Sequence, residues 1–395
     1  MKKTLLVILS AALLTAALAG CGSKSPDTEM GASEYPYGSA ETPSQEATTP
    51  PQPDATPGDG TGANAQGIDY DSVFAAFAPE TVMINIGDYT VTWGELFFFL
   101  RGYTDNLIAG LGEISDWSEA PYGDVSYAEV ALMYSSEFAQ MYKAIEYGAS
   151  MSGVSLSAGD LDMLREEFEY MSELYGGEEE YLKLIWDRDG CYSKELLDYI
   201  YETIHLANLT FSELYGDEGE KLTDEDAADF AANAGYLMAM HILRLKPENG
   251  EDTALAEIED ILVRLNAYSG DDFAGYFADM MFEHSEDQGG LASYPEGYLF
   301  QYGDMVNSFY EACVALSAGE ISGVVESEYG YHIIYRKPID FEAVPFSNYM
   351  QGDYRPLRSF VANSLFDSVI FEWMGSLEVV YTAEYESMDL AMLLG

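Results

Sequence analysis

Apolar positions along the chain change their spacing several times, and each change marks a different kind of segment. Residues 5–18 form an apolar run, whereas residues 22–67 carry almost no aliphatic side chains. Two short β-prone runs then flank Gly87 and Asp88, which predicts a tight hairpin. After the hairpin, the spacing of three and four that is typical of helices continues to about residue 233.

A capping motif and three apolar groups carry the helical pattern. Thr92 and Glu95 form a Thr-x-x-Glu capping box, so we expect a helix to begin beside the hairpin. The apolar groups are Val130, Tyr134, Phe138, Met141 and Ile145; Leu161, Leu164, Phe168, Met171 and Leu174; and Leu197, Ile200, Ile204, Ala207, Phe211 and Leu214. A hairpin followed by a mostly helical unit is therefore predicted for residues 79–234.

A different unit begins near residue 235, where the apolar spacing changes from the helical period to two. Strands are predicted at residues 237–245, 322–326 and 331–336 and, beyond this unit, at residues 377–382. Helices and an irregular stretch lie between the first two strands, which gives an α+β unit over residues 235–338. Helical spacing returns at residues 346–373.

The α+β unit interrupts the helical one, because helical spacing both precedes and follows it. Long insertions are tolerated when their ends meet in space, so we expect residues 339–395 to pack back on residues 79–234. Within the insertion, one predicted helix begins at Asp304. It would place Met305 and Phe309 on one face, because they are four residues apart.

Charge narrows the range of functions. The chain of 395 residues has 17 Lys and Arg against 69 Asp and Glu, a formal net charge of −52. Such a surface repels phosphate backbones, which excludes nucleic acid as a partner. It also repels anionic lipid headgroups, so attachment to a membrane needs another cause. The hydrophobic fraction of 48% excludes a wholly disordered chain.

The N-terminal residues supply a cause for attachment to a membrane. The apolar run of residues 5–18 is shorter than the roughly 20 residues of a spanning helix. It ends at Leu18-Ala19-Gly20-Cys21, which resembles the lipobox of bacterial lipoproteins. The resemblance implies a signal peptide at residues 1–20 and a lipidated Cys21 at the extracytoplasmic face of the cell membrane. Residues 21–78 are predicted to be a disordered tether rich in Pro, Ser, Thr and acidic residues. An ordinary signal peptide with a chance cysteine is the alternative.

A series of short motifs occurs within residues 235–338. It consists of Met240-His241-Ile242-Leu243, Gly270-x-Asp272-Phe273-Ala274, Ser285-x-Asp287, Gly303-x-Met305-Val306, Phe309, Leu316-x-x-Gly319-Glu320-Ile321-Ser322, Val325-x-Ser327 and Gly330-Tyr331-His332-Ile333-Ile334. In order and spacing the series resembles the parvulin family of peptidyl-prolyl isomerases. The layout of the whole chain resembles the PrsA/SurA group of extracytoplasmic foldases. These resemblances imply a parvulin-type antiparallel sheet with surrounding helices, inserted into a mostly helical, SurA-N-like chaperone domain.

The resemblance to parvulins also implies roles for individual side chains. These are His241, Asp287, His332 and Ser327 as catalytic residues, and Met305, Phe309 and Leu299 as the residues that seat the substrate proline. Family members often carry Gly-Gly-Asp-Leu-Gly before the seat, where this chain has Tyr294-Pro295-Glu296-Gly297-Tyr298. The apolar rim residue therefore falls on Gly297 or shifts to Leu299. No cofactor and no metal are implied. Each role has an alternative. Met305 and Phe309 could be ordinary core residues, the two histidines could be purely structural, and Asp287 could be a solvated surface residue.

The chemistry of prolyl isomerisation fits these residue types. An X-Pro amide has a rotation barrier near 20 kcal/mol because its C–N bond is partly double. A catalyst breaks no bond but must stabilise the twisted amide, with an apolar seat, dry surroundings and suitable polar groups. The predicted function is a lipid-anchored foldase that isomerises X-Pro bonds of unfolded, newly secreted polypeptides. The segment 247–252 carries three acidic residues and no basic one. It therefore argues against substrates with a phosphorylated residue before the proline, because recognition of a phosphate needs basic residues.

Two other functions stay open. A non-catalytic holdase chaperone would keep the parvulin fold, and Gly297 favours it. A substrate-binding lipoprotein of a transporter would need two βαβ lobes, and the long helical stretch argues against them. Cys191 and Cys313 are either separate buried thiols or a disulfide pair, and the oligomeric state does not follow from the sequence.

Overall fold

The structure is a computed structural model that describes residues 67–121, 123–247 and 253–395. The chain separates into two units, residues 1–53 and 54–395, and every described residue belongs to the second. Cys21, the predicted signal peptide and most of the predicted tether lie outside the described residues. Among the described helices, none combines the length and the apolar character that crossing a membrane requires.

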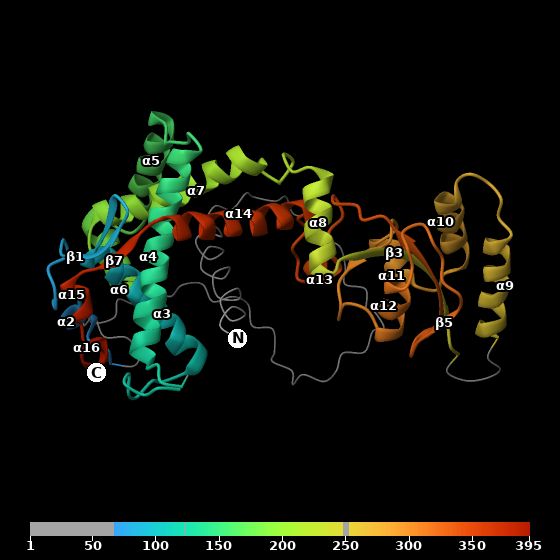
Figure 1. The fold of residues 1–395 in the computed structure, drawn as a ribbon, viewed down its shortest axis with the longest axis horizontal. Coiled ribbons are helices and arrows are strands. Elements are labelled where there is room, and N and C mark those ends of the chain that lie inside the picture. Colours follow the sequence, from blue (N-terminus) through green and yellow to red (C-terminus); the bar gives the residue numbers. More distant parts are fainter. Residues whose placement is uncertain (1–66, 122, 248–252) are drawn as a thin grey trace. The chain divides into compact units, whose positions relative to one another are not determined.

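A three-stranded antiparallel sheet brings together segments that are about 300 residues apart in the sequence. Its strand order is β2 (Tyr89–Thr92), β1 (Val82–Ile86) and β7 (Val379–Tyr381). The predicted hairpin of β1 and β2 is confirmed, and β1 pairs on its other edge with β7 (Figure 1). A strand near the C-terminus thus completes a sheet that begins near residue 82.

Outside residues 235–338, the other described elements are helices. They are α2 (Tyr70–Phe74), α3 (Trp93–Leu111), α4 (Tyr127–Met151), α5 (Ala158–Leu174), α6 (Glu178–Asp189), α7 (Lys194–Tyr215), α8 (Asp224–Ala234), α13 (Phe346–Met350), α14 (Leu357–Ser376), α15 (Ala383–Glu386) and α16 (Leu390–Leu394). The capping box of Thr92 and Glu95 is confirmed at the start of α3. Helices α14 and α16 both pack on α4, and Leu390 and Leu394 of α16 join the core around Trp93.

The folded part begins earlier than the sequence predicts. Helix α2 lies inside residues 21–78, which were predicted to be disordered tether. Tyr70 is fully buried and its hydroxyl lies 2.7 Å from Thr104 Oγ1. Ile68 and Val73 are buried as well. The tether prediction is wrong for this stretch, because its apolar side chains pack into the core of the helical unit.

The helix predicted over residues 346–373 is also corrected. Two helices occupy this stretch, α13 and α14, and the residues between them are not helical. Pro356 stands immediately before α14 in extended conformation. The ring of a proline disfavours helical backbone at the residue that precedes it, so a helix could not run through this point unbroken.

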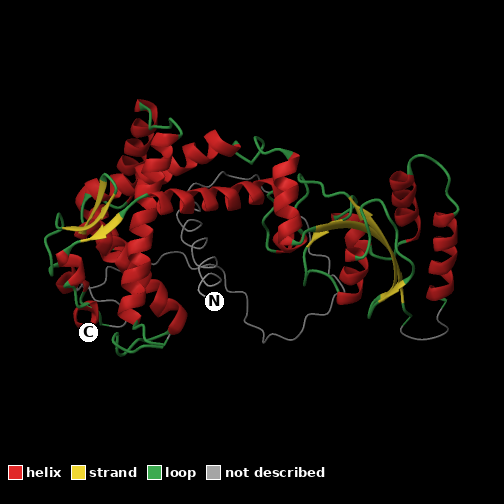
Figure 2. Ribbon diagram, in the orientation of Figure 1, coloured by secondary structure: helices red, strands yellow, loops and turns green. Residues whose placement is uncertain are grey.

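A four-stranded antiparallel sheet forms the middle of the chain. Its strand order is β4 (Tyr298–Phe300), β3 (Leu237–Leu245), β6 (Gly330–Lys337) and β5 (Val325–Glu326). Strand β3 is buried on both faces as far as Leu243, which accounts for its nearly continuous apolar sequence. The predicted α+β class and the antiparallel sheet are confirmed (Figure 2).

Helices cover both faces of this sheet. Helices α9 (Ala254–Asn266) and α10 (Phe273–His284) pack on the face that carries Met240 and Ile242. Helix α12 (Asn307–Val314) packs on the other face, with Ala239 and Ile334. The short helix α11 (Gln288–Ser293) connects α10 to β4.

Helix α12 begins three residues later than predicted. Asp304 does not start the helix, because its carboxylate accepts a hydrogen bond from the backbone N–H of Gln301, 2.8 Å away, and closes a turn. Val306 keeps a ψ of 142° and caps α12. Met305 therefore precedes the helix, and its predicted position on one helical face with Phe309 is wrong.

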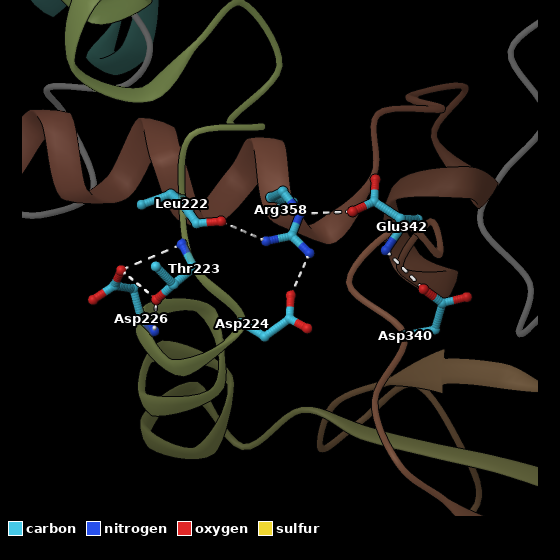
Figure 3. Close-up of polar contacts among 7 residues, drawn as sticks. All are labelled: Leu222, Thr223, Asp224, Asp226, Asp340, Glu342 and Arg358. Atoms are coloured by element: carbon cyan, nitrogen blue, oxygen red, sulfur yellow. Dashed lines mark hydrogen bonds and ion pairs between the residues drawn. The ribbon is translucent and has the colours of Figure 1, made fainter.

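One arginine binds the chain segments on both sides of the α+β unit at residues 235–338, which we call the middle unit. Arg358 of α14 lies 2.7 Å from the carboxylate of Asp224 and 2.6 Å from that of Glu342, and it donates to the carbonyl of Leu222 (Figure 3). Leu222 and Asp224 precede β3, and Glu342 follows β6. Through ion pairs and a hydrogen bond, Arg358 thus links both the segment before the middle unit and the segment after it to α14.

Candidate functional site

Four buried polar side chains form a continuous hydrogen-bonded chain beside α12. His241 Nε2 lies 2.8 Å from Asp287 Oδ2, and His241 Nδ1 lies 3.1 Å from His332 Nδ1. His332 Nε2 lies 2.6 Å from the hydroxyl of Ser327. The two histidines come from the neighbouring strands β3 and β6, while Asp287 is the N-cap of α11. All four side chains are at least nine-tenths buried.

The carboxylate at one end of this polar chain fixes the direction of the first hydrogen bond. A carboxylate only accepts, so His241 donates from Nε2 to Asp287. Nδ1 of His241 and Nδ1 of His332 share the second hydrogen bond, and Nε2 of His332 and the hydroxyl of Ser327 share the third. Every ring nitrogen of the two histidines therefore has a hydrogen-bond partner.

Burial and hydrogen bonding set the charge states. Burial raises the pKa of Asp287, but His241, the amide of Gly290 and the hydroxyl of Tyr298 outweigh it and bring this pKa to about 2. Burial, with the neighbouring His241, lowers the pKa of His332 to about 3. At neutral pH Asp287 is therefore a carboxylate and His332 is uncharged.

An aromatic side chain stands over the two histidines. The ring centroids of Phe309 and His241 lie 5.2 Å apart at an interplanar angle of 89°, and those of Phe309 and His332 lie 5.6 Å apart at 79°. Met305 packs in the same apolar cluster as Phe309. We call Met305 and Phe309, the two residues predicted to bind the substrate proline, the proline seat. The structure thus brings His241, Asp287, His332, Ser327, Met305 and Phe309 together.

Leu299 does not belong to this group. It is 1% exposed and packs with Met238 and with Leu357 and Val361 of α14. Its neighbour Phe300 joins the cluster of Phe309, because successive side chains of a strand point to opposite faces of the sheet. The prediction that Leu299 forms the rim of the proline seat is therefore wrong.

Tyr298 is a site residue that the sequence analysis missed. Its hydroxyl donates to Asp287 Oδ2 over 2.8 Å, and its ring centroid lies 5.7 Å from that of His241. Tyr298 also lines a cavity of about 10 Å³ together with Asp287 and Tyr294. The signal for Tyr298 was in the sequence: this chain has Gly297-Tyr298 where the family pattern often has Leu-Gly.

The two other histidines bind partners away from the polar chain, and part of the acidic segment lies outside the described residues. His205 pairs with Asp160, and His284 lies 2.9 Å from Arg264. Cys191 and Cys313 are both buried and free, so they do not form a disulfide. The described residues contain no group of three or more His, Cys, Asp or Glu side chains that could hold a metal ion. Residues 248–252 of the acidic segment lie outside the described residues.

The site lies in a region that matches a known family. Residues 241–337 match the family model for Rotamase, the PPIC-type PPIASE domain. This match confirms the parvulin-type domain that the motifs predicted.

The chain is also similar to curated foldases. The foldase protein PrsA of Halalkalibacterium halodurans is 39% identical over 118 residues, which are 30% of this chain and 32% of that protein. PrsA of Oceanobacillus iheyensis is 30% identical over 174 residues, which are 43% of this chain and 50% of that protein. PrsA of Bacillus subtilis is 28% identical over 138 residues, or 35% and 42% of the two chains. The chain spans about a third to a half of the length of these relatives.

The comparison with solved structures gives matches at low TM-scores. One is the peptidylprolyl isomerase PrsA from Bacillus cereus, with 16% identity, 71% of this chain and 98% of that chain covered, and a TM-score of 0.29. Another belongs to the SurA-like chaperones PEB4 and Cj1289 of Campylobacter jejuni, with 21% identity, coverage of 61% and 94%, and a TM-score of 0.22.

Proposed function

We propose that this protein is a lipid-anchored extracytoplasmic foldase that catalyses cis/trans isomerisation of X-Pro bonds in unfolded, newly secreted polypeptides. The observation that carries the proposal is the buried chain Asp287–His241–His332–Ser327 beneath Phe309, inside a region that matches the PPIC-type PPIase domain. The names of the similar curated proteins, foldase protein PrsA, support the same function.

The proline seat supplies the apolar half of the mechanism. Met305 is half-buried and offers an apolar surface for the pyrrolidine ring of the substrate, and the buried ring of Phe309 packs behind it and excludes water from the amide. In a dry site, polar groups stabilise a redistributed charge more strongly than they do in water. The twisted amide has lost its conjugation, so a surface that fits it better than the planar amide lowers the barrier.

The polar chain supplies a rigid floor. Asp287 holds the ring of His241 through Nε2, and His241 in turn fixes His332. Because Asp287 is 5% exposed and already accepts from His241, Tyr298 and the Gly290 amide, it acts on the substrate through His241. His241, His332, Ser327 and Asp287 are thus positioning residues in this proposal, and no proton needs to be transferred.

The proposal is tested by cis/trans exchange of X-Pro peptides with the full chain. We expect exchange to be accelerated in proportion to protein concentration. Exchange at the uncatalysed rate would contradict the proposal. The uncatalysed reaction takes tens of seconds, so the two results are well separated.

A non-catalytic holdase is the second candidate. It is favoured by Gly297 and Tyr298, which stand where similar proteins often have Leu-Gly and therefore change the rim of the seat. A holdase would suppress the aggregation of an unfolded client without accelerating X-Pro exchange. Measuring both activities on the same preparation separates the two functions.

Attachment through Cys21 is a further part of the proposal, and we make a separate prediction for it. The supporting feature is Leu18-Ala19-Gly20-Cys21 at the end of an apolar run. Several acyl chains together would hold the protein on a membrane, since each buried CH₂ contributes about 0.8 kcal/mol. We expect Cys21→Ala to abolish labelling with a lipid precursor in a bacterial host. Labelling equal to that of the wild type would refute the anchor, and Cys191→Ala serves as the matched control.

A further inference from the structure

The residue at position 297 cannot carry the rim of the proline seat. Gly297 has a φ of +100°, a conformation that side chains disfavour. A Cβ at this position would also lie 2.6 Å from the carbonyl oxygen of Ala239, in the neighbouring strand. Any wall on this side of the seat must therefore come from another residue.

Tyr298 lies where such a wall is needed. His241 has Phe309 at a centroid distance of 5.2 Å and Tyr298 at 5.7 Å, both nearly edge-on. The hydroxyl of Tyr298 donates a hydrogen bond to Asp287, which also accepts one from His241. The ring is thereby fixed beside the floor of the seat, and its side chain is half-buried, so part of it remains accessible.

Two further rings pack against Tyr298. The centroid of Tyr294 lies 4.5 Å away and that of Phe346 lies 5.6 Å away. Tyr294 and Phe346 also contact each other at 5.5 Å. We call Tyr298, Tyr294 and Phe346 the aromatic wall. Phe346 belongs to α13 and lies beyond residues 241–337, so the wall is completed from outside the matched domain.

We propose that the aromatic wall is a specificity subsite, in which Tyr298 selects an aromatic or large aliphatic residue before the proline and Phe346 holds Tyr298 in place. This inference rests on the proposed isomerase function. The side chain of residue X is attached next to the carbonyl of the reacting amide, so it lies close to whatever borders the seat. Aromatic pairs contribute about 0.5–1.5 kcal/mol beyond area burial, which corresponds to a preference of about twofold to tenfold.

The test compares two peptides that differ only in having Phe or Ala before the proline. For the full chain, the ratio of kcat/KM for the Phe-Pro and Ala-Pro peptides is measured in the wild type, Tyr298→Ala, Tyr298→Phe and Phe346→Ala. We expect the wild type to prefer Phe-Pro by at least about threefold. The preference should disappear in Tyr298→Ala, persist in Tyr298→Phe, which keeps the ring, and weaken in Phe346→Ala.

Tyr302→Ala is the matched control. Tyr302 is 73% exposed, and its ring contacts Tyr310 rather than the wall. We expect it to keep the wild-type preference. Melting curves identify variants that have lost structure, and Phe346→Ala, which changes no side chain of the proline seat or polar chain, tests the wall even if Tyr298→Ala unfolds.

The outcomes separate the subsite from the function on which it rests. A folded Tyr298→Ala or Phe346→Ala variant with the full wild-type preference overturns the subsite, as does a wild type without preference. If the wild type accelerates neither peptide, the isomerase function fails. The subsite is then judged by the ratio of dissociation constants of the same two peptides, measured by fluorescence anisotropy. An equal affinity for both peptides overturns it.

Discussion

Individual side chains of the site could be predicted to different degrees. His241, Asp287, His332 and Ser327 were identified because they stand in motifs whose order and spacing resemble a known family. Leu299 was assigned wrongly and Tyr298 was missed, because their roles depend on which way each points from β4. That direction follows from the register of β4 against β3, which pairs Tyr298 with Ala239 and Leu299 with Met238 and is a tertiary contact.

The buried His332 should make stability depend on pH. Its pKa is about 3 in the folded protein and 6.5 as the ordinary value, because burial and His241 disfavour the cation. Between these values the unfolded chain binds a proton that the folded chain does not, so the free energy of unfolding falls as pH falls from about 6.5 towards 3. Asp287, with its lowered pKa of about 2, adds a further loss only below its ordinary value of 3.8.

Urea unfolding at pH 7 and pH 5 measures this effect. We expect the wild type to lose about 1–2 kcal/mol more than His332→Gln between these two pH values, since one pKa unit corresponds to about 1.4 kcal/mol. Glutamine keeps a polar side chain but does not titrate. An identical loss in both proteins would show that His332 is not buried as a neutral ring.

At the scale of elements, the strands and helices with strong local patterns were predicted well. The hairpin of β1 and β2 and the capping box at Thr92 depend on neighbouring residues alone. The start of α12 and the break between α13 and α14 were missed, because apolar spacing continues through both points. The carboxylate of Asp304 and the ring of Pro356 interrupt the backbone there without changing that spacing.

The contacts of Arg358 should stabilise the junction around the middle unit. Its side chain is 13% exposed and binds Asp224, Glu342 and the carbonyl of Leu222 (Figure 3). We expect Arg358→Met to lower the free energy of unfolding by about 1–3 kcal/mol, because several hydrogen bonds to a charged group are lost together. Urea unfolding gives the value.

Arg355→Met is the control for this prediction. The side chain of Arg355 is 53% exposed, pairs with Asp353 two residues away and lies over the ring of Phe360. Exposed pairs of this kind contribute about 0–1 kcal/mol. Equal effects of the two substitutions would mean that Arg358 does not tie the flanking segments together.

At the scale of the whole molecule, the sequence predicted that residues 339–395 pack back on residues 79–234 but not which elements contact each other. The pairing of β1 with β7 and the packing of α14 and α16 on α4 join segments on both sides of residues 235–338. Such contacts between distant segments have no local pattern. The same holds for Phe346, which completes the aromatic wall from a segment beyond the matched domain.

The central claim is that the proline seat over the polar chain accelerates X-Pro exchange, and Phe309→Ala tests it most directly. Removal of this buried ring takes away the side chain that supports Met305 and keeps water from the amide. We expect kcat/KM to fall at least tenfold, which is about 1.4 kcal/mol of lost stabilisation of the twisted amide. Phe309→Leu should fall less, because it keeps most of the apolar volume.

A melting curve must accompany the measurement, since removing a buried aromatic ring can cost about 3–5 kcal/mol of stability. The decisive number is the exchange rate of an X-Pro peptide with folded Phe309→Ala, compared with the wild type at equal concentration. The account predicts a rate at least tenfold lower for the variant. A folded Phe309→Ala protein with the wild-type rate would contradict it.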